Sequence, residues 1–419
     1  MSALETCPYP GCSGTAAHGL QTCPDCSRLL LWCTCGSANR LFARHCRHCG
    51  QRLLPTGEWR QAGGDATGSH YLSRQIPFMP QIAEEPECRF HAGGKPQGQC
   101  LYGHGHLFFA TDTGVHIVRE HDLAAITTVP GSGPVIQAMA LTDEFLLLAG
   151  EAGLEAIPLR ALLEAEGKPA EAARRALLRQ SLAAGPLPPL LVLAGYPLAC
   201  AATETDLHLV ALGTDPTPPP LPRAGRGAIV LVQTPAGVVV MEESGEVWLA
   251  DPASGQRAWQ RKAVDALQLA AGCAAWENRI YLLTAGGTLL VVNAEQGRLL
   301  QSTVRAGSAV GIACDAGAVF LAGDLGLQRC RPIEGESVTV SNQTLLTPPL
   351  LVAGTVFAGT NYGALLCCDS RGTQVRYMLR EGLPDLPQCT PVLVGNHLYL
   401  TYASGDVLRY SILPGGQPA

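Results

Sequence analysis

"VFAGTNYGALLCCDSRG" (residues 356–372) contains two short apolar runs separated by a polar turn with a glycine. The second run ends at Asp369, and a second turn closes on Gly372. Apolar runs of this length, bounded by Gly, Asn and Asp, are typical of β-strands joined by tight turns. The stretch therefore predicts a β-hairpin, and the recurrence of this pattern along the chain decides the fold.

The same arrangement returns with a period of roughly forty residues. The gap between 153 and 245 is twice as long, and it contains the strand-like segment "TDLHLVALG" (205–213), which supplies the missing repeat. Such a period, built from short strands, is typical of a β-propeller with one four-stranded blade per repeat. Eight turn markers predict a mainly β protein with seven or eight blades. The shared glycines are Gly114, Gly153, Gly245, Gly287, Gly326, Gly363 and Gly405.

The composition agrees with many short strands and excludes some classes of function. The chain has 419 residues, of which 47% are apolar and 15% charged, with 47 Gly and 31 Pro. A net charge of −6 argues against a wholly basic nucleic-acid coat. The longest apolar stretch (189–202) is too short to span a bilayer, and the N-terminus lacks the basic start and apolar core of a secretory signal. We expect a cytoplasmic protein without a membrane span.

The segment "TPPLLVAGTVFAGTNYGALLCCDSRGTQVRYML" (347–379) resembles the PQQ-type repeat of quinoprotein-like propellers. That repeat has a Pro-led strand, a Gly turn and an Asp-x-x-x-Gly turn, and parts of it recur in 238–260, 280–300 and 390–410. The chain has no Trp-Asp dipeptide of the WD-repeat kind. The resemblance covers about residues 98–413, and it implies the architecture rather than an activity.

A quinone cofactor is not expected. Quinoproteins of this type use adjacent cysteines beside the cofactor, and Cys367 and Cys368 are adjacent. The aligned residues of the neighbouring repeat are Val291 and Val292, which indicates that the pair fills a strand. Those enzymes are also exported, bind Ca²⁺ and carry Trp-rich motifs, whereas this chain has five Trp. With no nucleophile elbow, phosphate loop or paired carboxylates, the chain is predicted not to be an enzyme, and a quinoprotein-like enzyme is the remote alternative.

Eight of the 17 cysteines lie within the first 49 residues, as two sets of two pairs separated by ten residues. Each pair can supply two thiolates from one turn, and two pairs complete a tetrahedral shell around Zn²⁺. A segment this short buries little apolar surface, so the metal would supply much of its folding free energy. We predict two structural zinc ions, with an iron–sulfur cluster or disulfides as alternatives. The ligands are Cys7, Cys12, Cys23 and Cys26 for the first ion, and Cys33, Cys35, Cys46 and Cys49 for the second.

The cysteine pattern resembles the double zinc ribbon over about residues 5–52, through "CPYPGC", "CPDC", "WCTCG" and "CRHCG". It departs from the family in two spacings, because four residues separate the first pair of cysteines and a single residue separates the third. A histidine can replace a thiolate in such sites. The candidates here are His18, His45 and His48.

The second half of this module is basic. No acidic residue occurs between Ser27 and Gly57, and Trp32 and Phe42 stand among the arginines. Such a face can contact phosphates and stack bases, although arginines also solvate a small module and offset the charge of a four-thiolate site. Candidate contacts with nucleic acid or a partner are Arg28, Arg40, Arg44, Arg47 and Arg52.

The domain plan has tandem zinc ribbons at 1–52, a partly docked linker at 53–97 and a propeller at 98–413. Its insertions are a helical segment at about 159–185 and a Pro-rich loop at 214–227. Within the linker, "YLSRQIPFMPQI" (71–82) is apolar enough to dock on the propeller. A third metal site is conceivable from residues near the junction, namely Cys88, His91, Cys100 and His104.

Together these features predict a non-catalytic scaffold, an accessory subunit of a bacterial-type cytoplasmic complex. The combination of zinc ribbon and propeller is similar to subunits that accompany AAA-type ATPases and von Willebrand-type domains. The alternative is a nucleic-acid-binding adaptor that grips phosphates through the Arg-rich ribbons.

Overall fold

The computed structural model describes most of the chain, and among these residues no helix is both long and apolar enough to cross a membrane. The described residues are 4–9, 12–17, 23–26, 30–33, 35–40, 46–49, 60–61, 71–72, 80–130, 136–164, 174–183, 190–213, 217–262, 272–303, 307–315, 318–352, 354–378 and 385–413.

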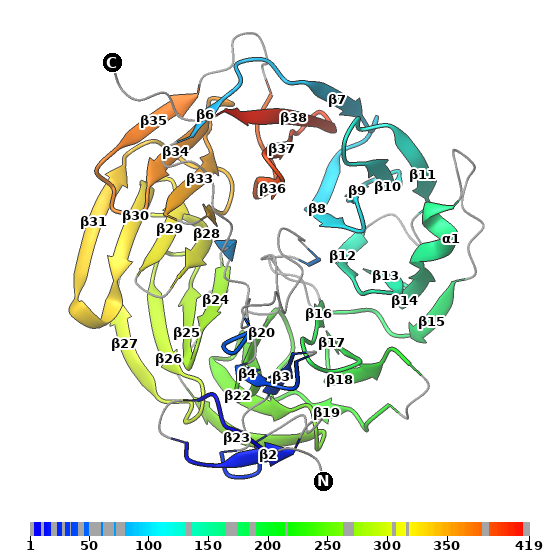
Figure 1. Ribbon diagram of the computed structural model, residues 1–419, viewed down its shortest axis with the longest axis vertical. Helices are drawn as coiled ribbons and strands as arrows, with labels where there is room; N and C mark the ends of the chain where they lie inside the picture. The colour runs from blue at the N-terminus through cyan, green and yellow to red at the C-terminus, as the bar shows by residue number, and fades with distance from the viewer. Residues whose placement is uncertain are drawn as a thin grey trace.

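Eight antiparallel sheets stand around a central axis, which makes the protein an eight-bladed β-propeller (Figure 1). Blade one has β8 (Pro96–Gly103), β9 (His106–Thr111), β10 (Gly114–Arg119) and β11 (Ala125–Val129). Blade two has β12 (Ile136–Leu141), β13 (Phe145–Gly150), β14 (Gly153–Pro158) and β15 (Arg175–Leu178). Blade three has β16 (Leu190–Val192), β17 (Leu198–Ala202), β18 (Asp206–Ala211) and β19 (Leu221–Pro222). Blade four has β20 (Ile229–Thr234), β21 (Gly237–Glu242), β22 (Glu246–Asp251) and β23 (Gln256–Lys262).

The second half of the ring repeats this order. Blade five has β24 (Gly272–Trp276), β25 (Arg279–Leu283), β26 (Leu289–Asn293) and β27 (Leu299–Thr303). Blade six has β28 (Ala309–Cys314), β29 (Val319–Gly323), β30 (Gly326–Arg331), the short helix η1 (Pro332–Glu334) and β31 (Glu336–Ser341). Blade seven has β32 (Leu350–Val352), β33 (Thr355–Gly359), β34 (Leu365–Asp369) and β35 (Val375–Met378). Blade eight has β36 (Val392–Val394), β37 (His397–Thr401) and β38 (Asp406–Leu413), and the first strand of each blade lies nearest the axis.

The ring closes by pairing strands from its two ends. The outermost strand of blade eight is β7 (Cys88–His91), which precedes blade one in the sequence and pairs antiparallel with β38. Arg89 binds Asp406 through two hydrogen bonds of 2.6 and 3.0 Å, and His91 lies 3.0 Å from the same carboxylate. The propeller therefore begins about ten residues before the predicted boundary at 98, and the choice between seven and eight blades resolves to eight.

The repeated glycines lie in or directly after the turn between the second and third strands of their blades, and all have a positive φ. At Gly326 φ is 86°, and a Cβ atom would overlap with the carbonyl oxygen of Ser341 on the neighbouring strand. Only glycine combines this backbone conformation with such a close approach. The periodic signal in the sequence therefore has a steric cause.

An Asp or Asn followed by a Gly forms the turn between the third and fourth strands, with three residues between them in blades four (Asp251–Gly255) and five (Asn293–Gly297) and two in blade seven (Asp369–Gly372). In blade seven, Asp369 is buried, and its carboxylate accepts hydrogen bonds from the backbone N–H groups of Thr373 and Gln374. In blade five, the side chain of Asn293 accepts one from the N–H of Gln296. These side chains satisfy the turn's own backbone donors, which is why Asp and Asn favour such positions.

The insertion at 159–185 differs from the prediction in its second described part. Among its described residues (159–164 and 174–183), Leu159–Leu163 forms helix α1, whereas Arg175–Leu178 forms β15, the outermost strand of blade two. The Leu- and Ala-rich sequence favours a helix, but the open edge of β14 offers it a strand partner, and this tertiary contact overrides local propensity. The Pro-rich loop likewise supplies β19, the outermost strand of blade three.

The segment predicted as a linker is attached to the inside of the ring. The carbonyl of Arg60 accepts the N–H of Leu141 at 2.6 Å, and the side-chain amide of Gln61 exchanges two hydrogen bonds with the backbone of Val192. Residues 60–61 thus connect the innermost strands of blades two and three. The Gln61 side chain acts here as one more peptide group in the pattern of backbone pairing.

Two further attachments lie across the ring. Strand β5 (Tyr71–Leu72) pairs parallel with β32, the innermost strand of blade seven, and β6 (Gln81–Ile82) pairs with the end of β38. Blade seven stands across the axis from blades two and three (Figure 1). The predicted docking of 71–82 is therefore found at β5 and β6, and described residues of the N-terminal segment bind both sides of the channel.

Candidate metal centres

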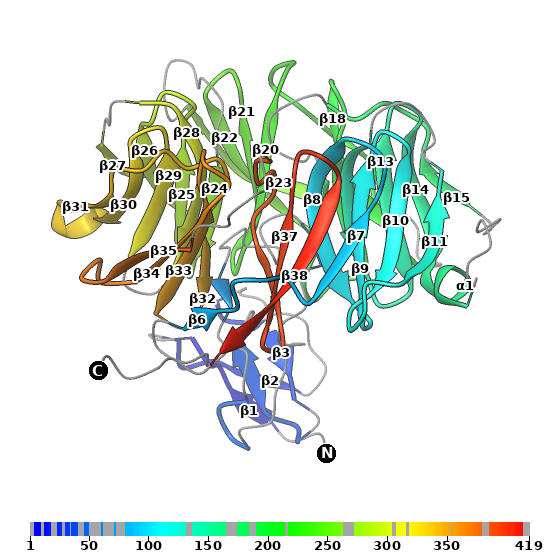
Figure 2. The same cartoon turned by 90° about the horizontal axis from the view of Figure 1, so that it is seen from above.

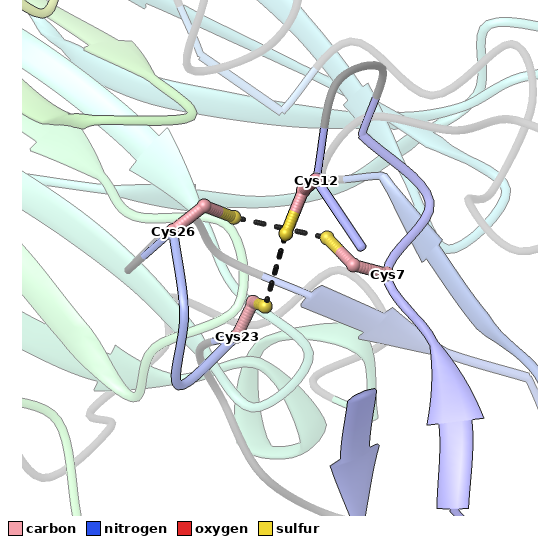
Figure 3. A group of neighbouring side chains, drawn as sticks. All are labelled: Cys7, Cys12, Cys23 and Cys26. Carbon is pink, nitrogen blue, oxygen red and sulfur yellow. Dashed lines mark hydrogen bonds between the residues drawn. The ribbon is translucent and has the colours of Figure 1, made fainter. Parts of the chain in front are cut away.

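The first group of cysteines lies in a module outside the ring, where β1 (Leu4–Thr6) pairs with β2 (Thr15–Ala17). The sulfurs of Cys7, Cys12, Cys23 and Cys26 point toward one another (Figure 3), and all lie within 4.8 Å of each other. The Cys7–Cys26 and Cys12–Cys23 sulfur pairs are 3.7 and 3.8 Å apart. Two chain turns thus meet to form one four-sulfur group.

The second group is built in the same way next to β3 (Leu30–Trp32) and β4 (Ala38–Arg40). Cys33, Cys35, Cys46 and Cys49 converge within 4.8 Å, with sulfur pairs 3.6 and 3.7 Å apart. Cys35 and Cys49 are exposed, whereas each cysteine of the first group is at least half-buried. The single-residue spacing of Cys33 and Cys35 therefore does not prevent closure of the group.

Each of the two groups fits one tetrahedrally coordinated ion. A Zn–S bond of about 2.3 Å implies that neighbouring sulfurs lie about 3.8 Å apart, since the edge of a tetrahedron is about 1.6 times its centre-to-corner distance. The observed 3.6–3.8 Å match this value. A disulfide would need a sulfur–sulfur distance of about 2.05 Å, and none of the eight cysteines forms one. The cysteines predicted from their spacing are the ones that the fold brings together.

In each group, hydrogen bonds lower the pKa of one thiol and so favour its thiolate form. Burial raises the pKa of Cys23, but hydrogen bonds from the backbone of Cys26 and Asp25 outweigh it and lower the pKa to about 7. Burial also opposes ionisation of Cys46, and hydrogen bonds from the backbone of Cys49 and His48 lower its pKa to about 5. Four thiolates at such close range repel each other, so full deprotonation requires a cation between them.

The predicted basic face is described only in part. Arg28, Arg44, Arg52 and Phe42 lie outside the described residues, and Arg40 lies at the end of β4. Arg47 is described, and its guanidinium donates a 2.6 Å hydrogen bond to the carbonyl of Thr6 within the module. Of the alternative histidine ligands, His18 and His45 lie outside the described residues, and His48 does not belong to either metal-binding group.

The conceivable third metal site does not form among the described residues. Cys88, His91, Cys100 and His104 do not converge as a metal-binding group. The imidazole of His91 contacts Asp406 at the ring closure, and Cys100 is buried in the core. Burial raises the pKa of Cys100, as expected of a thiol used as a small apolar side chain.

The adjacent cysteines of blade seven occupy opposite faces of strand β34. Cys367 packs in the core shared with blades one, two and eight, and Cys368 packs in the core shared with blade six. Both are free thiols without exposed surface. Burial raises the pKa of Cys367 to about 12 and that of Cys368 further still. Their arrangement agrees with the prediction that the pair fills a blade strand.

A groove of about 660 Å³ lies at the outer rim between blades six and seven. Residues 339–343 line one side, and Tyr362, Ala364 and Val375 line the other. The lining includes hydroxyl and amide groups but no carboxylate, histidine, lysine or arginine. It therefore offers hydrogen bonds and apolar contact without an acid–base pair.

The fold and the two four-cysteine groups define a class by architecture: an eight-bladed β-propeller that carries an N-terminal module with two candidate metal centres. The family described as outer membrane protein assembly factor BamB matches residues 243–335, which is less than half of the chain. No curated protein matches the sequence.

Three solved structures illustrate the range of proteins that share this fold. Quinohemoprotein alcohol dehydrogenase from Comamonas testosteroni has a TM-score of 0.63 and 11% identity, over 86% of this chain and 81% of that one. Sqt1 from Saccharomyces cerevisiae has a TM-score of 0.61 and 11% identity, over 78% and 98%. BamB from Moraxella catarrhalis has a TM-score of 0.55 and 14% identity, over 79% and 99%. At these identities the likeness shows the fold alone.

Proposed function

We propose that this protein is a non-catalytic scaffold, an accessory subunit of a cytoplasmic multi-protein complex, which binds partners through a zinc-held module and a rigid propeller. The observation that carries this proposal is the attachment of the N-terminal segment to both sides of the channel, at Arg60–Gln61 and at β5. The chain's own backbone pairs with the innermost strands of blades two and seven, so these strand edges are not open to a ligand.

This attachment also limits where the module can go. Ten residues separate Cys49 from Arg60, and the eleven steps from one Cα atom to the next cover at most about 3.6 Å each, so Cys49 stays within about 40 Å of the inner ring. Figure 2 places β1, β2 and β3 beyond one face of the propeller. Two surfaces held at short range raise each other's effective concentration, so that a partner touching both binds tightly through two modest contacts.

In each group, the four cysteines would hold one zinc ion, and the ion would act by fixing the fold of the module rather than by reacting. Closed four-sulfur shells leave no position for a substrate, which is the pattern of structural sites. The rim groove has no charged group in its lining, so it is better suited to binding a peptide or loop than to acid–base catalysis. AAA-type ATPases and proteins with von Willebrand-type domains remain the partners that we expect.

The proposal is tested by affinity capture from the native host, using the full chain and a chain without residues 1–55. This deletion leaves Arg60 and Gln61, and therefore the channel attachments, in place. We expect one partner set for the full chain and its partial loss after the deletion. Salt-dependent binding of the full chain to DNA or RNA, abolished by the same deletion, would favour the nucleic-acid adaptor instead. Saturable binding of added PQQ in the presence of Ca²⁺ would favour the enzyme.

A further inference from the structure

Arg47 joins the two candidate metal centres. It lies between two ligands of the second group, Cys46 and Cys49, and its guanidinium reaches into the first half of the module. Its Nη2 donates to the carbonyl oxygen of Thr6 at 2.6 Å and to the hydroxyl of Thr6 at 3.2 Å. Thr6 directly precedes Cys7, a ligand of the first group. A single side chain thus connects the backbone beside one metal centre to the backbone beside the other.

The position of Arg47 depends on the second centre being formed. Asn39 is only 1% exposed, and its side-chain oxygen accepts the backbone N–H of Arg47 at 2.8 Å. The amide nitrogen of Asn39 donates to the carbonyl of Ser37 at 2.9 Å and approaches the Cys46 sulfur at 3.6 Å. The backbone N–H of His48 also points at that sulfur, at 3.4 Å. This network orients the turn that carries both a metal ligand and Arg47.

We propose that zinc binding at the two centres is cooperative and that Arg47 is the positioning residue that couples them. This inference rests on the proposed binding of zinc by the module. An ion in the second centre fixes residues 46–49, which holds the guanidinium against Thr6 and thereby orders the chain at Cys7. By thermodynamic linkage, an ion in the first centre strengthens binding at the second by the same factor.

The hydrogen bond to the Thr6 carbonyl carries this coupling. Arg47 also lies 3.5 Å from the carboxylate of Glu5, but both side chains are more than one third exposed. Exposed ion pairs contribute little and are screened by salt. The coupling should therefore persist at high ionic strength and after Glu5→Gln, while Arg47→Ala removes it.

A double-mutant cycle on the full, zinc-loaded chain tests the proposal. Cys12→Ser disables the first centre, and competition with a zinc chelator then measures the affinity of the second. When Arg47 is retained, we expect the zinc ion left in the Cys12→Ser variant to bind about tenfold more weakly than the more weakly bound of the two ions in the wild type. This factor corresponds to a coupling free energy of about 1.4 kcal/mol. When Arg47→Ala is added both to the wild type and to Cys12→Ser, the same two zinc affinities should differ by no more than about twofold.

Arg160→Ala is the matched control, since Arg160 lies on helix α1 of blade two and forms an exposed ion pair with Glu164, which directly follows the helix. It should leave the tenfold coupling intact. Equal coupling with and without Arg47, or independent release of the two ions from the wild type, would overturn the proposed coupling but leave the zinc assignment intact. A wild-type chain that retains no zinc would overturn the zinc assignment as well. The propeller's thermal transition, measured in every variant, confirms that the chain is folded.

Discussion

The N-terminal module and the propeller are held together by different chemistry. Among the described residues of the module, the buried apolar cluster has six members, and two of them are the candidate metal ligands Cys7 and Cys23. In the propeller, one cluster runs through blades one, two, seven and eight, and further clusters fill the contacts between the other blades. A small core cannot offset the entropy of ordering the chain, whereas a large one can. We therefore expect the module to depend on bound metal for its stability, and the propeller to depend on burial.

Cysteine shows the contrast within one residue type. Cys23 in the module and Cys200 in the propeller both have no exposed surface. The pKa of Cys23 is lowered to about 7 by backbone N–H groups that outweigh its burial, whereas burial alone raises the pKa of Cys200. The first is prepared to become a thiolate ligand, and the second is a small apolar side chain. At an equal degree of burial, the hydrogen bonds that each thiol receives therefore set the direction of its pKa shift.

The largest effect is expected from replacing Cys23, with the same replacement at Cys200 as the comparison. Cys23→Ser should remove one zinc ion and, with it, folding free energy on the order of ten kcal/mol from the module. Metal analysis should fall from two zinc ions per chain to about one, and limited proteolysis should cut within residues 4–49. Cys200→Ser makes the same chemical change at an equally buried position, and it should keep both ions while lowering propeller stability by about 1–3 kcal/mol. Equal loss of zinc from both variants would break the comparison.

A deletion in the core tests the opposite dependence. Phe357 has no exposed surface and lies on β33 in the largest cluster. Phe357→Ala should destabilise the propeller by about 3–5 kcal/mol, because it removes buried area and leaves a cavity. Denaturant unfolding followed by far-UV circular dichroism measures the change. The zinc content should stay at two ions per chain, and a parallel fall in zinc would show that the two regions share one core.

A glycine pair tests the steric origin of the repeat. Gly326→Ala places a methyl group against the Ser341 carbonyl at a φ of 86°, so we expect a loss of about 3 kcal/mol. Gly335 has a φ of 71° and open space around it, so Gly335→Ala should cost only about 1 kcal/mol. Thermal unfolding of the two variants side by side gives the difference. Equal losses would mean that backbone conformation alone, without close packing, maintains the repeated glycine.

The smallest effect concerns the ring closure. Burial raises the pKa of Asp406, but hydrogen bonds from Arg89, Ser404 and His91 outweigh it, so the pKa lies below its usual range. A lowered pKa contributes stability above the unfolded-state value of about 4, and this contribution is lost as the pH falls below it. Arg89 and His91 are more than half exposed, so screening limits the cost of Asp406→Asn to about 1–2 kcal/mol at pH 7. The gap between the variant and the wild type should narrow as the pH falls below about 4, and a constant gap would contradict this assignment.

Much of the architecture could be predicted from local sequence. The glycine at each predicted hairpin marks a real turn, because positive φ is a property of a few neighbouring residues. The blade count stayed open because β7, the closing strand, reads only "CRFH" and pairs with residues more than 300 positions away. A strand this short carries no periodic signal that would assign it to the last blade rather than to a linker.

The candidate site divides in the same way. Ligand identity followed from two cysteine pairs ten residues apart, since chelation by a turn depends on short-range spacing. The roles of Arg47 and Asn39 did not follow, because both depend on how two ribbons pack together. The attachment of Gln61 to the inner strands lacked any signal, since a single amide looks like ordinary linker sequence. The apolar character of 71–82 predicted docking on the propeller, but not which strand β5 would pair with.

The sequence by itself therefore determined the elements: strands, turns, the propeller class and the two sets of four thiols. Tertiary structure decided how distant elements meet, namely the eighth blade closed by β7, the capture of Arg175–Leu178 as a strand, the channel attachments and the contact between the metal centres. The physical reason is range. Backbone conformation and chelate spacing are set within a few residues, whereas pairing partners depend on which edges and pockets the rest of the chain leaves open.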